Sequence, residues 1–171
     1  NIKFHRMIKG EIKTLTIIKT STNKWFACFS VVQEISPSIR QSNKIIGLDL
    51  GLETFATLSD GKIIENPRLL KESLELLQSR SRQLSKKSKG SCNRLKSRLK
   101  LAKLHEKVSN QRLDFLHKLT SKLVKEYDCI ALEYLRPSEM KNKYLQFSIY
   151  DACWDKFRKL LTYKAENAGC K

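Results

Sequence analysis

Two acidic residues, Asp49 and Glu133, each stand in a short apolar segment with the composition of a buried strand. Asp49 lies in residues 44–50 and Glu133 in residues 128–134, in each case near the carboxyl end of the segment. An ionised carboxylate is costly to bury unless it is paired or binds a metal. These two acids are therefore the first candidates for a site that does chemistry.

The chemistry that two such carboxylates could share is metal binding. The residues between the two segments are numerous enough for the crossover that parallel neighbouring strands need, so both acids could reach one ion. Hard oxygen ligands suit Mg²⁺ or Mn²⁺, and two such ions about 3.5–4 Å apart activate water and stabilise the leaving oxygen in phosphodiester hydrolysis. Plainer alternatives are a carboxylate bound by backbone donors for Asp49 and a solvent-facing strand end for Glu133.

A run of basic residues between positions 80 and 107 is the second candidate site, and Glu106 is its only acid. Like charges spaced four apart weaken a helix, so a polyanionic partner explains the run better than a solvated face does. The predicted nucleic-acid-binding residues are Arg80, Arg82, Lys86, Lys87, Lys89, Arg94, Lys96, Arg98, Lys100 and Lys103.

The composition points the same way. Thirty-four Lys and Arg oppose 17 Asp and Glu, a formal charge of +17, which gives sequence-independent affinity for phosphate backbones. The five cysteines are scattered with no C-x-x-C pair, so neither zinc ligands nor a disulfide framework is predicted. No apolar run approaches the roughly 20 residues of a membrane span. We expect a cytoplasmic protein with no membrane partner.

The elements that hold these residues follow from hydrophobic periodicity. Alternation over residues 11–33 predicts a β-hairpin. Residues 36–43 are rich in Ser and contain one Pro, which predicts a linker and a domain boundary. Further strands are predicted over residues 44–50, 54–58, 62–64 and 128–134, and helices over 67–127, broken at 89–91, and over 149–168. The first three of these strands are expected to be antiparallel, followed by helices and a fourth strand.

These residues also resemble a known family. Ile46-Gly-Leu-Asp49-Leu-Gly51 resembles the first RuvC motif of the TnpB (OrfB) transposon proteins, relatives of the type V CRISPR effectors, and Ile130-Ala-Leu-Glu133 resembles the second. The resemblance implies an α/β fold with a partial ribonuclease-H-like (RuvC) domain over residues 44–171, into which long basic helices are inserted. Residues 1–40 would then be the end of an oligonucleotide-binding (wedge) β-barrel.

The resemblance implies an RNA-guided DNA endonuclease that hydrolyses phosphodiester bonds by metal-ion catalysis. Asp49 and Glu133 would be its catalytic, metal-binding residues, with Mg²⁺ or Mn²⁺ as cofactor and with DNA and a guide RNA as partners. Family members continue into a fifth strand, a four-cysteine zinc ribbon and a third motif with the last catalytic Asp. This sequence has no counterpart of those parts, so the zinc expected in the full-length family has no ligands here, and we expect a piece of a longer protein.

Two other functions stay open at this point. One is a nuclease-inactive remnant or RNA-guided DNA binder, which the missing third acid favours. The other is a basic structural protein of a ribonucleoprotein, which explains the charge but not the paired acids. Without a fifth strand, Cys129-Ile-Ala-Leu132 is expected to form an exposed sheet edge, through which the chain could associate with itself.

Overall fold

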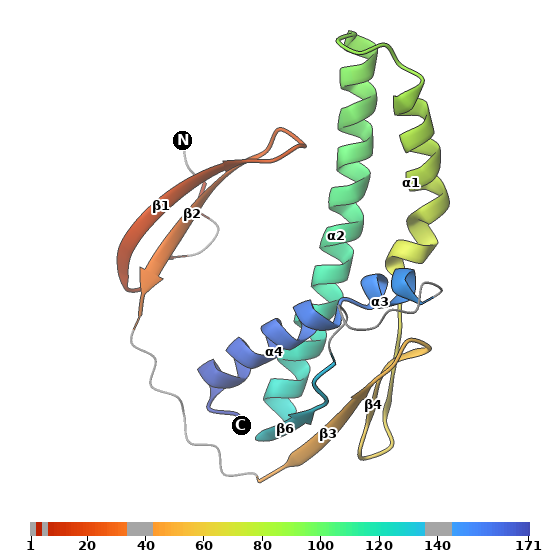
Figure 1. Cartoon of the computed structure of the whole chain (residues 1–171). Helices are drawn as coiled ribbons and strands as arrows, with labels where there is room; N and C mark the ends of the chain where they lie inside the picture. Colours follow the sequence, from red (N-terminus) through yellow and green to blue (C-terminus); the bar gives the residue numbers. More distant parts are fainter. Residues whose placement is uncertain (1–2, 5–6, 34–42, 136–144) are drawn as a thin grey trace. The chain divides into compact units, whose positions relative to one another are not determined.

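The computed structural model describes residues 3–4, 7–33, 43–135 and 145–171 (Figure 1). The chain divides into two compact units. The first, here the hairpin unit, comprises Asn1–Ser36 and Arg80–Glu106, and the second, the sheet unit, comprises Pro37–Ser79 and Lys107–Lys171. The sequence analysis did not anticipate that residues 80–106 group with the amino-terminal hairpin.

The hairpin unit contains the predicted antiparallel pair, β1 (Glu11–Lys19) and β2 (Trp25–Val32). The turn closes through the Thr20 carbonyl, which accepts the Asn23 N–H at 3.0 Å. Asn23 has a positive φ of 63°, a conformation that asparagine tolerates well. The predicted hairpin over residues 11–33 is therefore confirmed.

Two helices follow in the sequence, α1 (Leu69–Ser85) and α2 (Cys92–Glu126). The break falls where the sequence predicted it, at residues 89–91, and Gly90 there has a φ of 83°. Positive φ is nearly free of cost for glycine, and it lets the chain reverse between the helices. None of the described helices is both long and apolar enough to cross a membrane.

The sheet unit is built on four strands in the order β5-β4-β3-β6. Their bounds are β3 (Ile45–Leu50), β4 (Thr54–Leu58), β5 (Ile63–Glu65) and β6 (Cys129–Leu132). Strands β3, β4 and β5 form an antiparallel meander, and β6 pairs parallel with β3. The predicted antiparallel triplet is confirmed, and so is the parallel placement of the second acid-bearing segment beside the first.

Helices cover one face of this sheet (Figure 1). Alternate residues of β3 (Ile46, Leu48 and Leu50) are buried in a core that also contains residues of α2 and of α4 (Trp154–Ala168). At its centre the Phe55 ring meets the rings of Phe115 and Phe157 edge-on, each at 5.2 Å between centroids. The sheet therefore buries one face in this core and leaves the alternate residues of β3 on the other face.

The predicted last helix over residues 149–168 is wrong in one respect, because it is two helices. A short helix α3 (Gln146–Ala152) precedes α4, and Cys153 between them has a left-handed φ of 56°. Hydrophobic periodicity did not reveal the break because the apolar residues on both sides belong to one core. The predicted boundary over residues 36–43 lies almost entirely outside the described residues.

The outer edge of β6 is partly paired, which corrects the expectation of a fully exposed edge. The Lys171 N–H donates to the Asp128 carbonyl at 2.9 Å, and the Lys171 carbonyl accepts the Ile130 N–H at 2.8 Å. These two bonds are the pattern of a parallel bridge opposite Cys129. The chain returns from α4 to the edge of the sheet and satisfies its backbone there.

Candidate nuclease site and nucleic-acid-binding surface

Asp49 lies in the middle strand of the sheet, on the face opposite the helices. Its neighbours Leu48 and Leu50 are buried in the core, whereas Asp49 is exposed and stands across from Thr57 of β4. The expectation of a buried carboxylate is therefore wrong. Both segments are apolar, but the strand period of two turns Asp49 to the open face, so the cost of burying a charge does not bear on its role.

Glu133 comes directly after β6 and is also exposed. The last parallel pair between the strands is Leu48 with Leu132, and Asp49 and Glu133 are the residues that follow this pair in the two chain segments. Neighbouring strands lie about 4.7–4.9 Å apart, and side chains at paired positions share a face. The fold therefore places both predicted site residues near the carboxyl ends of two neighbouring parallel strands.

The strand positions before these acids carry small residues. Gly47 and Ala131 are a parallel pair two residues before Asp49 and Glu133, and Gly47 meets Ser59 on its other side through two bonds of 3.0 and 2.9 Å. A Cβ on Gly47 would make only ordinary contact with Ser59 at 3.5 Å, so packing within this unit does not require glycine there. The small residues leave room for a ligand to approach Asp49.

A third metal-binding side chain does not join the two acids in the described part of the chain. No group of three or more His, Cys, Asp or Glu that could hold an ion occurs there. Two carboxylates supply part of the shell of a hard cation such as Mg²⁺, which commonly keeps several waters.

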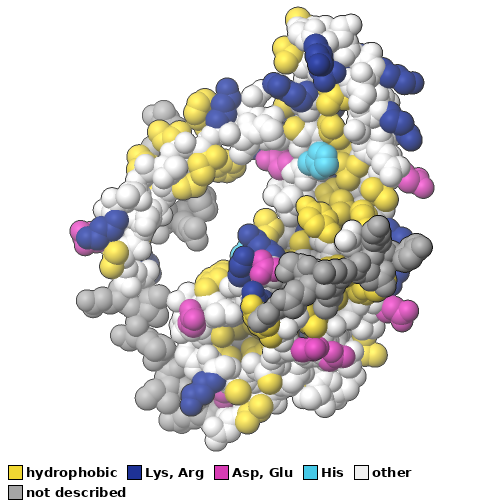
Figure 2. All heavy atoms as spheres, viewed as in Figure 1, with side chains coloured by type: hydrophobic (Ala, Val, Ile, Leu, Met, Phe, Trp, Pro, Cys, Tyr) yellow, Lys and Arg dark blue, Asp and Glu magenta, His cyan; other side chains and the backbone are white. Residues whose placement is uncertain are grey.

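The predicted basic residues lie at the adjoining ends of α1 and α2 and in the turn between them, all in the hairpin unit. Eight of the ten are exposed, and Arg80 and Arg94 are half-buried. Figure 2 shows Lys and Arg side chains gathered over this tip of the helical pair. We call these ten residues the helical-tip cluster.

Arg94 has a structural contact that the sequence did not reveal. Its guanidinium donates to the carbonyls of Leu84 and Lys87 at 3.0 and 2.9 Å. These carbonyls lie at and beyond the end of α1, where helix carbonyls lack intrahelical partners. Arg94 therefore ties the two helices together, and its charge is directed inward.

The single acid of the basic run is already engaged. Glu106 accepts the Lys24 ammonium at 2.9 Å and the Thr22 hydroxyl at 3.2 Å, which joins the β-hairpin turn to α2. The Lys24 hydrogen bond is the main reason that the pKa of Glu106 lies below its usual value. Nearby Lys96, Lys100 and Lys103 recur at four- and three-residue steps on α2, so they share one exposed face.

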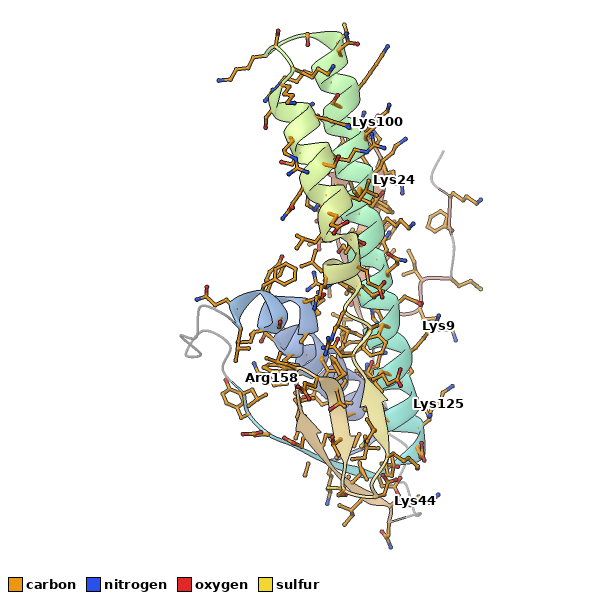
Figure 3. The ribbon with its side chains drawn as sticks, turned by 90° about the vertical axis from the view of Figure 1, so that its right-hand side faces the viewer. Lys9, Lys24, Lys44, Lys100, Lys125 and Arg158 are labelled. Carbon is orange, nitrogen blue, oxygen red and sulfur yellow. The ribbon has the colours of Figure 1, made fainter. Side chains whose placement is uncertain are left out.

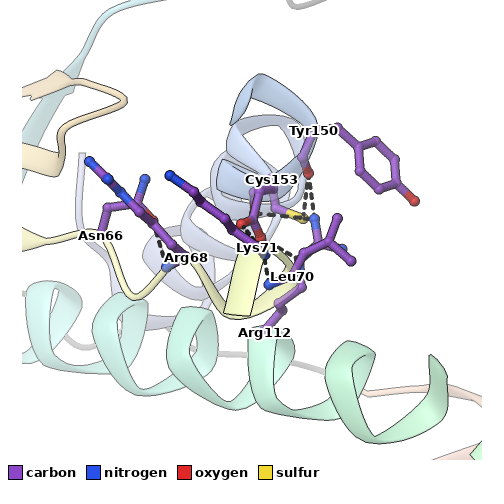
Figure 4. A network of polar contacts seen from close by, with 8 residues as sticks. Asn66, Arg68, Leu70, Lys71, Arg112, Tyr150 and Cys153 are labelled. Carbon is purple, nitrogen blue, oxygen red and sulfur yellow. Dashed lines mark hydrogen bonds and ion pairs between the residues drawn. The ribbon is translucent and has the colours of Figure 1, made fainter. Parts of the chain in front are cut away.

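A buried polar network at the base of the helices was not predicted as a site (Figure 4). Asp151 of α3 accepts the N–H groups of Leu70 and Lys71, each at 3.1 Å, and so caps the first turn of α1. Arg112 of α2 lies 3.7 Å from the same carboxylate and donates to the Tyr150 carbonyl and the Cys153 sulfur. One acid thus links three helices. The one sign of it in the sequence is that a charged residue, Asp151, interrupts the apolar pattern of residues 149–157.

Beside Glu133, the ring of Tyr134 packs under the guanidinium of Arg158 with 4.4 Å to the ring centroid. Arg158 also pairs with Asp155 at 3.1 Å. The hydrogen bond with Tyr134 is the main cause that raises the pKa of Arg158 above its usual value. This contact fixes the residue that follows Glu133 against α4.

Residues 28–143 match the OrfB_IS605 family, whose description is "Probable transposase". The chain is 35% identical over 156 residues to a "Putative RNA-guided DNA endonuclease" of Streptomyces pristinaespiralis, covering 91% of this chain and 39% of that protein. It is 32% identical over 175 residues to the "Putative RNA-guided DNA endonuclease InsQ" of Escherichia coli strain K12, covering 93% of this chain and 43% of that protein.

The chain thus spans about two fifths of the length of these curated relatives. The matched region holds both acid-bearing strands and the whole helical-tip cluster, so the similarity covers the residues from which the sites above are built. With a family match over more than half of its length, the chain belongs to the OrfB_IS605 family of transposase-like proteins.

Proposed function

We propose that this chain carries two of the metal-binding acids of an RNA-guided DNA endonuclease. The observation that supports this most directly is the parallel pairing of β3 and β6, whose last pair, Leu48 with Leu132, comes directly before two exposed acids, Asp49 and Glu133. Phosphodiester hydrolysis needs the acids to be accessible to a bulky, charged substrate. Exposed carboxylates meet that need better than the buried pair expected from the sequence.

The topology supports a ribonuclease-H-like domain in the sheet unit. An antiparallel meander, a helical crossover and a fourth strand parallel to the first give the order β5-β4-β3-β6, with the Asp49 strand inside the sheet. The hairpin of β1 and β2 is proposed to belong to an oligonucleotide-binding wedge. Its exposed apolar side chains, among them Ile17 and Trp25, are those of a hairpin that packs against further strands.

Asp49 and Glu133 would hold Mg²⁺ or Mn²⁺, because carboxylate oxygens are the ligands those cations prefer. The bound cation would supply an activated water and charge stabilisation at the leaving oxygen. In this proposal Asp49 and Glu133 orient the site and keep it anionic, and the small residues Gly47 and Ala131 let a phosphate approach.

DNA and a guide RNA are the proposed partners. The names of the relatives describe RNA-guided DNA endonucleases. In such proteins base pairing with the guide selects the target, while the protein holds the nucleic-acid backbone. The helical-tip cluster is suited to that second task, and Glu106, the acid of the same basic run, is committed to Lys24 of the β-hairpin.

A second candidate is a nucleic-acid binder that does not cut. The observation that favours it is the contrast between the sites: the helical-tip cluster is complete in this chain, whereas two acids alone make a weak metal site. In that case the cationic surface would carry the function and the acids would have no catalytic role.

Manganese titration of the full chain, followed by the loss of the free-ion electron paramagnetic signal, tests the proposal. We expect weak binding that Asp49→Asn and Glu133→Gln each abolish. Glu65→Gln is the matched control, because Glu65 is an exposed acid at the end of β5 in the same unit. If all three variants bind Mn²⁺ as the unchanged chain does, the two acids do not form the site.

A further inference from the structure

A second group of cations lies in the sheet unit, apart from the helical tip. These side chains come from the carboxyl half of α2 and from α4, and we call them the α2–α4 cluster: His117, Lys118, Lys122, Lys125, Lys156 and Lys164. A shallow hollow on this surface is lined by His117, Lys118, Ser121, Lys122, Lys125 and Glu126. The sequence analysis assigned no role to any of them.

Lys164 fixes the seam between the two helices. Its ammonium donates to the His117 carbonyl at 2.8 Å and to the hydroxyls of Thr120 and Ser121 at 2.7 and 2.9 Å. All three acceptors are uncharged, and no ion pair of Lys164 occurs among the described residues. Burial lowers the pKa of Lys164 below its usual value. Among the described residues, the positive charge at this seam is therefore held by hydrogen bonds to uncharged groups and not by an ion pair.

The lysines of α2 in this cluster share one face. Lys118, Lys122 and Lys125 are all exposed and recur at four- and three-residue steps, so they form a stripe along the helix. Figure 3 shows Lys125 projecting from the side of α2. At 1.5 Å per residue the stripe is about 10 Å long, which suits contact with several phosphates of one strand.

Nearby acids offset little of this charge. Glu126 and Asp155 are bound by other cations, Lys62 at 3.2 Å and Lys159 at 2.7 Å. Within the described ranges, Asp114 is the one acid that pairs with a member of the cluster, Lys118, at 2.6 Å, and that pair is exposed. Exposed pairs of this kind are weak and are screened by salt, so Lys118 can exchange its partner.

The pKa of His117 reflects the charges around it. Its pKa lies below the usual value because of partial burial first, and then because of the nearby cations Lys164 and Lys156, while Asp114 acts in the opposite direction. A simpler role for the lysines is to stabilise the carboxyl end of α2, where cations favour the helix dipole. That effect is confined to the last turn, so it accounts for Lys125 but not for Lys118.

We propose that the α2–α4 cluster is a second contact surface for the phosphate backbone of a nucleic-acid duplex, with the Ser121 hydroxyl as an additional donor. This rests on the proposed function, since it supposes that the chain handles nucleic acid. It adds a site on the sheet unit, independent of the helical-tip cluster. The lysines supply charge without reading bases, so the surface holds duplexes of different sequence alike.

The test is fluorescence anisotropy of the full chain with a short DNA duplex, an RNA–DNA hybrid of the same sequence and a single-stranded RNA, each over a range of salt. Lys118→Gln, Lys122→Gln and Lys125→Gln are combined in one variant. The matched control combines Lys44→Gln, Lys71→Gln and Lys159→Gln, which removes equal charge from exposed positions of the same unit.

Each phosphate contact contributes about −0.9 to the log–log salt slope on duplex DNA. We therefore expect the first variant to flatten the slope by roughly two to three units and the control to leave it unchanged. The His117 imidazole titration midpoint, followed by NMR, should rise when the duplex binds. The three ligands show whether DNA or the hybrid is the preferred duplex, and a preference for single-stranded RNA would overturn the duplex assignment.

Equal slopes for the two variants would overturn the proposal while leaving the proposed function intact. If the unchanged chain binds none of the three ligands, this proposal fails together with the assignment of nucleic-acid partners. Manganese binding at Asp49 and Glu133 is measured separately, so loss of the metal site does not affect the result.

Discussion

At the scale of single residues, Asp49 and Asp151 show how differently one side-chain type can be used. Asp49 lies on the open face of the sheet, where water and ions reach it. The Asp151 side chain is 5% exposed and is held by two backbone N–H groups and Arg112. The first is accessible to a partner from outside the unit, and the second satisfies the end of a helix inside it.

Asp151→Asn should destabilise the sheet unit. The variant leaves Arg112 without a counter-charge in a buried setting, and breaking such a pair costs about 3–5 kcal/mol. Urea unfolding of the full chain measures the change. Asp155→Asn serves as the control: that carboxylate is 50% exposed, and its loss should cost less than about 0.5 kcal/mol. Equal losses of unfolding free energy in the two variants would show that the Asp151 network stabilises the unit no more than an exposed ion pair does.

Lys62 should make stability depend on pH. It bonds Asp60 and Glu126, which lowers the pKa of each below the ordinary values of 3.8 and 4.5. A carboxylate with a lowered folded-state pKa stabilises the protein above its ordinary pKa, and this contribution is lost as the pH falls through the folded value. The same bonds raise the pKa of Lys62, so its own contribution persists to a pH above 10.5.

Replacing Lys62 with Met should therefore lower the urea midpoint at pH 7, and the difference from the unchanged chain should shrink as the pH falls below about 4. Circular dichroism of urea unfolding at several pH values measures it, with Lys71→Met as the exposed control. A difference that stays constant down to pH 2 would contradict the assigned linkage.

At the scale of elements, helix α2 serves both units. Its first half presents Lys96, Lys100 and Lys103 on one exposed face, and its second half packs Leu116, Leu119 and Leu123 into the core below the sheet. A helix with two differently used halves explains why its apolar stripe is not uniform. It also separates the lysines that are proposed to bind nucleic acid from the leucines that form the core.

Combining Lys96→Gln, Lys100→Gln and Lys103→Gln should flatten the salt slope of duplex binding by roughly two to three units, because each lost phosphate contact removes about 0.9. Glutamine keeps the helix propensity close to that of lysine. Arg94→Ala should instead affect stability and not binding. It should cost about 1 kcal/mol of stability through two lost hydrogen bonds, with little change in the salt slope.

Anisotropy and thermal unfolding of both variants test this pair of expectations. If the triple variant keeps the original slope, the helical-tip cluster faces solvent without binding. If Arg94→Ala flattens the slope while stability is unchanged, its guanidinium contacts phosphate and not the end of α1.

At the scale of the whole molecule, a formal charge of +17 opposes any tendency to associate. The apolar side chains of the hairpin and the partly paired edge of β6 favour association, and like charge works against it. Salt screens repulsion over a Debye length of about 10 Å at 0.1 M. Salt should therefore act in opposite directions on self-association and on nucleic-acid binding.

We expect sedimentation velocity without nucleic acid to show self-association that rises with salt. Leu132→Pro tests whether β6 is the edge responsible, because proline removes an edge N–H. Its far-UV spectrum serves as the control for folding. Association that falls with salt would show that ion pairs, and not strand edges or apolar surface, hold the copies together.

The sequence by itself determined the hairpin, the antiparallel triplet, the break between the helices and the identity of the two acids. These follow from alternation, turn residues and local motifs, which act over a few residues. The tertiary structure decided which face of β3 is open, that Arg94 and Asp151 hold helices together, and that Lys171 reaches the edge of β6. Each of these depends on contacts between residues 10 or more positions apart, and side-chain type does not specify such contacts. The strand period of two predicts that Asp49 and its neighbours Leu48 and Leu50 point to opposite faces of the sheet. Only packing decided which of the two faces the helices cover.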